Sequence, residues 1–108
     1  NLFLHDTQLV IKEALRTYYH IYEEEAVDEL SDFLDHSDAA VADFSLANVL
    51  KYGGVYGATM HGGRLLSLLQ SDKDDDLVKA AGVIGAIGEK ELSIVTTCVV
   101  VVIFRFRH

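Results

Sequence analysis

The segment that most constrains the fold is the last one, Leu92–Phe106, which is rich in valine, isoleucine and threonine. β-Branched residues of this kind lose rotamer freedom in a helix and fit the pleated surface of a sheet. With the alternation of a strand, the central residues on both faces are apolar, which is typical of a strand covered on each side. The segment therefore predicts a long C-terminal β-strand.

This predicted strand has no partner of similar quality in the chain. Leu2–Leu4 and Val55–Tyr56 are the remaining candidates for strands, and both are short. A lone strand leaves its backbone amides and carbonyls unpaired. We therefore expect a homo-oligomer, in which a second copy of the chain supplies the missing strand across a two-fold axis. The alternative is that one of the segments interpreted below as a helix is itself a strand.

The first half of the chain has the apolar spacing of helices. Apolar residues recur with a period near 3.6 from Ile11 to Phe33, which predicts either one long helix or two helices broken near Tyr22–Glu24. Ser37-Asp38 is an N-cap signal for a helix over Ala39–Tyr52. Glycine at the end of that helix, in Gly53-Gly54, is typical of a C-cap.

The second half is predicted to be more broken. The glycines of Gly57–Gly63 indicate an irregular or tightly packed stretch. A short helix over Arg64–Gln70 and another over Leu77–Ile87 follow. The predicted fold class is thus α+β: a helix-dominated single domain packed on a small β-sheet that includes the C-terminal strand.

The size, net charge and cysteine content of the chain limit the classes of function that we expect. The chain has 108 residues, the size of one domain, and a formal net charge of −8. An acidic protein repels phosphate backbones, so nucleic acid is not an expected partner. The apolar centre of Leu92–Phe106 is well short of the roughly twenty residues of a spanning helix, so a membrane is not expected either. The single cysteine, Cys98, excludes an internal disulfide and favours a reducing, cytoplasmic setting.

An acidic window between Arg16 and Lys51 is the first candidate site. It contains nine Asp or Glu residues and no Lys or Arg. Four of these share a helix face through i,i+3 and i,i+4 spacing: Glu25, Asp28, Glu29 and Asp32. The functional interpretation is a partner-binding surface for a basic protein or for divalent cations. The structural alternative is a solvated helix face that keeps the protein soluble.

The glycine-rich segment is the second candidate site. Backbone amides near Gly57–Gly63 could approach an anion, and Arg64 could pair with it. Tyr56, His61 and Arg64 are therefore candidate ligand-binding residues, and His61 is the candidate general base of an enzyme. The segment matches neither the P-loop nor the dinucleotide fingerprint, so tight structural packing is the competing interpretation.

The sequence offers no specific metal or cofactor motif. His20 and Glu24 are four residues apart, but the paired Glu-x-x-His motifs of dimetal bundles are missing. We therefore expect neither metal nor cofactor. The predicted function is a non-enzymatic protein–protein interaction module, such as an adaptor, regulator or inhibitor, that presents an acidic helical surface. The alternative is a small enzyme or ligand-binding domain that uses the segment around His61.

Overall fold

The structure, a computed structural model, describes the backbone of residues 2–107 and the side chains of residues 7–101 and 104. Between residues 2 and 107 it consists of six α-helices and one 3₁₀ helix, with no strand. They are α1 (Leu2–Tyr22), α2 (Glu24–Glu29), η1 (Ser31–Asp35), α3 (Ala39–Tyr52), α4 (Gly54–Leu69), α5 (Asp74–Ile87) and α6 (Glu89–Arg107). The predicted α+β fold with a small sheet is therefore wrong, and the protein is all-helical.

The C-terminal segment forms helix α6 instead of the predicted strand. Leu92, Val95 and Val99 recur at helical spacing, and Val95 is buried in the core. A helix pairs its own backbone groups, whereas a lone strand cannot. Each β-branched residue costs only a few tenths of a kcal/mol in a helix, so this packing outweighs the local preference.

The predicted association through a C-terminal strand is also wrong, because the segment does not form a strand. Because residues 89–107 are helical, they offer no row of unpaired backbone groups for a second copy to pair with. The structure therefore gives no support to a homo-oligomer of that kind. Within residues 2–107, no helix is both long and apolar enough to cross a membrane.

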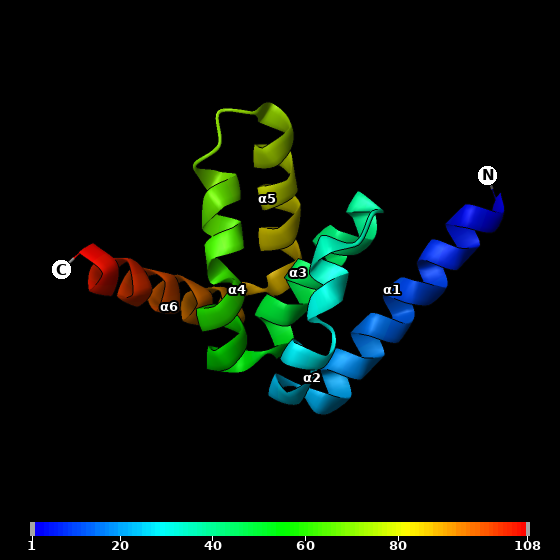
Figure 1. The fold of residues 1–108 in the computed structure, drawn as a ribbon, viewed down its shortest axis with the longest axis horizontal. Helices are drawn as coiled ribbons and strands as arrows, with labels where there is room; N and C mark the ends of the chain where they lie inside the picture. Colours follow the sequence, from blue (N-terminus) through cyan, green and yellow to red (C-terminus); the bar gives the residue numbers. More distant parts are fainter. Residues whose placement is uncertain (1, 108) are drawn as a thin grey trace.

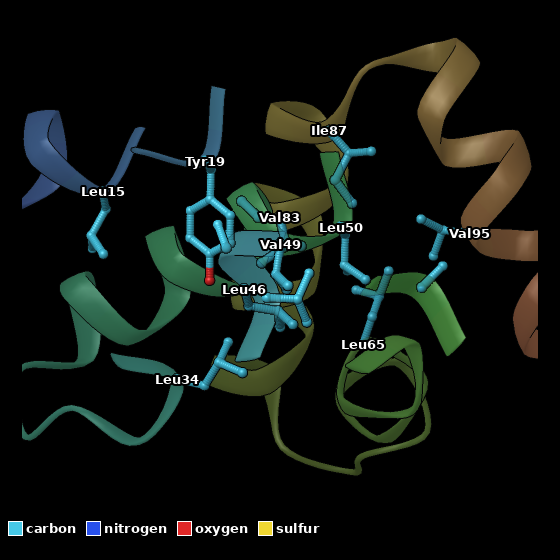
Figure 2. Close-up of a cluster of buried hydrophobic side chains, with 14 of the residues drawn as sticks. Leu15, Tyr19, Leu34, Leu46, Val49, Leu50, Leu65, Val83, Ile87 and Val95 are labelled. Carbon is cyan, nitrogen blue, oxygen red and sulfur yellow. The ribbon is translucent and has the colours of Figure 1, made fainter. Parts of the chain in front are cut away.

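Helix α3 is the centre of the fold and contacts every other helix (Figure 1). It is buried on nearly all sides from Ser45 to Leu50. Figure 2 shows the core that forms around it, with Leu15 and Tyr19 from α1 and Leu65 from α4. Helices α4 and α5 form an antiparallel hairpin, while α1 and α6 extend outward to opposite ends of the molecule (Figure 1).

Several local predictions are confirmed. The helix over Ala39–Tyr52 has the predicted bounds, and the Asp38 carboxylate accepts a hydrogen bond from the Ala40 amide at 2.9 Å. The chain breaks at Glu23, where φ is +48°, so the alternative with two helices is correct. Gly54 has a φ of +61°, the left-handed conformation that glycine adopts without strain.

The glycine-rich segment is helical, so of the two predicted alternatives the irregular stretch is wrong and the tightly packed one is confirmed. Two of its glycines, Gly57 and Gly62, lie at close contacts between helices. A Cβ atom on Gly57 would lie 2.6 Å from the Val49 carbonyl oxygen of α3. A Cβ atom on Gly62 would lie 2.7 Å from a methyl carbon of Val99 in α6. The glycines thus let α4 approach α3 at one end and α6 further along.

Candidate functional site

The acidic residues lie on α2 and η1, two short elements that follow the break at Glu23. Helix α2 has only six residues, too few to be stable alone in water. It is held by Ala26 and Val27, both fully buried in the core. The carboxylates of Glu25, Asp28 and Glu29 are consequently presented on the outer side of a segment fixed by packing.

Helix α4 supports one side of this acidic surface. The Tyr56 hydroxyl donates its one proton to the Asp28 carboxylate, whose two oxygens lie 2.7 and 2.8 Å from the hydroxyl oxygen. One turn beyond His61, the Arg64 guanidinium donates to the Asp35 carboxylate at 3.1 Å. The hydrogen bond with the Asp28 carboxylate raises the pKa of Tyr56, because loss of the phenolic proton would break it. The two candidate sites of the sequence therefore meet in space.

Helix α1 supports the other side. The Tyr18 hydroxyl donates to the Glu29 carboxylate. Asp28 and Glu29 are thus engaged with tyrosines from α4 and α1. Glu25 and Asp32 are exposed and have no hydrogen bond or ion pair with any side chain that the structure describes. Of the four predicted partner-binding residues, these two have carboxylates left open to a partner.

All three predicted ligand-binding residues, Tyr56, His61 and Arg64, lie on α4. They lie along one side of α4, where Tyr56 and Arg64 are exposed and each is engaged with a carboxylate. Arg64 lines a hollow with Leu34 and Leu68, but neither Tyr56 nor His61 lines it. This hollow therefore does not bring His61 together with both predicted neighbours.

The ionisation of His61 provides a test of this geometry. Partial burial of the imidazole and the nearby Arg64 guanidinium lower the pKa of His61 below its usual 6.5, against the opposite effect of Asp28 and Asp35. The unfolded chain then binds more protons than the folded one just below pH 6.5. The free energy of unfolding should therefore fall as the pH drops from 6.5 through the folded pKa.

We expect His61→Gln to reduce this loss of stability. The check is the urea midpoint of both proteins above pH 7 and near pH 5, together with an NMR titration of the His61 ring. The other ionisable groups are shared by the two proteins, so the difference between them isolates His61. Equal losses in both proteins would show that His61 is not shielded as the structure places it.

The tyrosine–carboxylate contacts and the role of Asp35 were not predicted from the sequence. A partly buried tyrosine hydroxyl needs a hydrogen-bond partner, but nothing in the spacing of the tyrosines assigns one. Arg64 offered a clearer signal, because it is the first arginine after the long acidic window. Pairing that arginine with the acidic window would have indicated that α4 lies against η1.

The site contains no cluster suited to a metal ion among the side chains that the structure describes. We compared the chain with family models, with curated proteins and with solved structures, and found no match in any of the three. Its function is therefore argued from its own residues.

Proposed function

We propose that this protein is a non-enzymatic interaction module that binds a basic partner through the acidic surface of α2 and η1. The observation that carries this proposal is the pair of open carboxylates, Glu25 and Asp32, on a segment fixed from two sides. No Lys or Arg occurs between Arg16 and Lys51 to neutralise this surface from within the same stretch. Arg64, which comes from α4, pairs with Asp35 instead.

Repulsion among the carboxylates of the acidic segment lowers the stability of the fold. A binding role would explain why these charges are kept. Like charges three or four residues apart destabilise a helix, and α2 and η1 accumulate them. The Tyr18 and Tyr56 hydroxyls stabilise Glu29 and Asp28 without cancelling their charge. The negative potential is therefore kept and directed outward, where it can accelerate and orient the approach of a cationic protein.

The test is charge reversal at the two open carboxylates. The probe is an unstructured lysine–serine peptide of about eighteen residues, and its affinity is measured by calorimetry at low ionic strength. We expect Glu25→Lys with Asp32→Lys to weaken binding about tenfold, because two attractive charges become repulsive. Neither carboxylate has a structural partner, so circular dichroism should show an unchanged fold.

A matched control separates this surface from net charge. Asp72 and Asp75 are exposed carboxylates at the far end of the α4–α5 hairpin. Reversing both changes the net charge by the same amount, and we expect less than about a twofold effect on affinity. If both double variants weakened binding equally, the peptide would be recognising total charge and the proposal would be wrong.

A further inference from the structure

An apolar hollow of about 210 Å³ opens beside the acidic surface, between α1 and η1. It is lined by Ile11, Ala14, Leu15 and Tyr18 of α1, by Phe33 of η1 and by Leu30 just before it. Both α1 and η1 pack on α3, but no Cα atom of α1 lies within 8 Å of a Cα atom of η1. A groove is left where a core contact would otherwise form. An apolar cavity of about 150 Å³ already holds a benzene ring, so this hollow has room for a large side chain.

The exposed side of α1 continues the apolar character of the hollow. Val10, Ala14, Thr17 and Ile21 follow one another at spacings of four, three and four residues, as in a helix–helix seam. Val10 is 68% exposed and Ile21 62% exposed, so none of the side chains that the structure describes covers these two positions. With a rise of about 1.5 Å per residue, it runs for about 17 Å, the length of three helical turns. Its spacing and length suit a helix as the occupant.

The charges around the groove indicate that the bound helix carries positive charge. Glu29 is hydrogen-bonded to Tyr18, which lines the hollow, and Asp32 is adjacent to Phe33. The cations of α1 lie elsewhere: the Lys12 ammonium is over the Phe44 ring of α3, and Arg16 pairs with Glu13. An apolar groove with carboxylates beside it and no cation in its lining is complementary to leucines flanked by lysines or arginines.

We propose that the groove between α1 and η1 binds an amphipathic, basic helix of a partner protein, with one large apolar side chain in the hollow. This inference rests on the proposed function and specifies the partner's secondary structure and its apolar anchor. In binding of this kind, apolar residues at i, i+3, i+4 and i+7 of the incoming helix pack into the groove. The open carboxylates then contact its flanking cations.

A second hollow serves as an internal comparison. It has a volume of about 200 Å³, lies between α4 and α6, and is lined by apolar residues together with Thr96. No carboxylate lines it, so it lacks the charge that would select a basic helix. Ala14 and Thr96 are both exposed residues at the edge of their hollows. Replacing either with phenylalanine fills one hollow and leaves the other open.

The test compares two synthetic peptides of about eighteen residues and equal charge. One is a lysine-rich helix with leucine at i, i+3, i+4 and i+7, and the other has serine in place of each leucine. We expect the leucine peptide to bind at least tenfold more tightly, because its apolar side chains enter the groove. Ala14→Phe should abolish this difference, while Thr96→Phe should change it less than about twofold.

A second variant tests the groove without phenylalanine, because phenylalanine at position 14 could itself disturb α1. Val10→Lys with Ile21→Lys places charges on exposed positions of the seam and should also remove the advantage of the leucine peptide. Equal affinity for the two peptides would overturn the groove proposal and leave the acidic surface standing. Binding of neither peptide would overturn the proposed function as well.

Two further outcomes would indicate a different binding site or a different occupant of the groove. Loss of leucine-peptide binding in Thr96→Phe alone would move the site to the hollow between α4 and α6. If sedimentation showed the free chain to be a dimer that Val10→Lys with Ile21→Lys dissociates, the occupant would be a second copy. Either result contradicts the proposal.

Discussion

Replacing Gly57 with alanine is expected to lower the free energy of unfolding by about 2–3 kcal/mol. A Cβ atom at this position would lie 2.6 Å from the Val49 carbonyl oxygen, and that oxygen belongs to the backbone of the central helix. A flexible side chain could move aside, but α3 cannot shift without disturbing the core around it. The measurement is urea unfolding followed by circular dichroism.

Gly63 provides the matched control on the same helix. A Cβ atom there would meet nothing within 4 Å, so alanine should fit without displacement. Gly63→Ala is expected to raise the free energy of unfolding by about 0.5–1 kcal/mol, because alanine is the better helix former. If Gly57→Ala and Gly63→Ala changed stability in the same direction, α4 would not lie as close to α3 as the structure places it.

The contact at Gly57 also matters for the candidate site. Close approach of α4 to the end of α3 brings Tyr56 within hydrogen-bonding distance of Asp28 on α2. A displaced α4 would lose this support of the acidic segment. We therefore expect Gly57→Ala to weaken binding of the lysine–serine peptide, in addition to its effect on stability.

The second large effect is expected at the centre of the core, where Leu50→Ala should cost about 3–4 kcal/mol of stability. Leu50 is 2% exposed and lies on α3, the helix that contacts all the others. Removing its side chain takes away apolar contacts and leaves a cavity that a rigid core only partly fills. Chemical denaturation of the purified variant measures the change.

Leu77→Ala is the control for this substitution. Leu77 lies in the first turn of α5 and is 42% exposed, so its loss removes far less buried surface. Because both positions are helical, the change in helix propensity is the same in the two variants. We expect a cost below about 1 kcal/mol for Leu77→Ala. Similar costs for the two variants would contradict the central position of α3.

Local signals in the sequence were sufficient wherever a helix end carries its own chemistry. Asp38 caps the helix over Ala39–Tyr52 through a side-chain hydrogen bond, and Gly54 turns the chain after it. Both features depend on residues within a few positions of each other. The sequence therefore located both helix ends to within a pair of residues, Ser37-Asp38 and Gly53-Gly54.

The C-terminal segment shows where local preference fails. The valines of Leu92–Phe106 favour a strand when each is considered alone. No strand exists between residues 2 and 107 to pair with it, and Gly62 of α4 lets the helix formed by this segment pack closely at Val99. The absence of a partner strand was visible in the sequence. It indicated a helical segment and not a sheet completed by a second copy.

The candidate site was predicted in two separate pieces for a similar reason. Asp28 and Tyr56 are 28 residues apart, and Asp35 and Arg64 are 29 residues apart. Their contacts depend on the reversal of the chain at Gly53-Gly54 and on the packing of α4. Spacing along the sequence contains no information about such contacts. It did identify the acidic residues themselves, because charge is a property of composition.

The most direct test of the proposed binding site, the acidic surface and the groove between α1 and η1, is an NMR titration of the ¹⁵N-labelled protein with the leucine peptide. Amide shifts should change along α1 from Val10 to Ile21 and over residues 25–33. The amides facing the hollow between α4 and α6 should stay unchanged and serve as the internal reference. Changes confined to residues 62–69 and 95–100, or spread evenly over the molecule, would contradict recognition by the acidic groove.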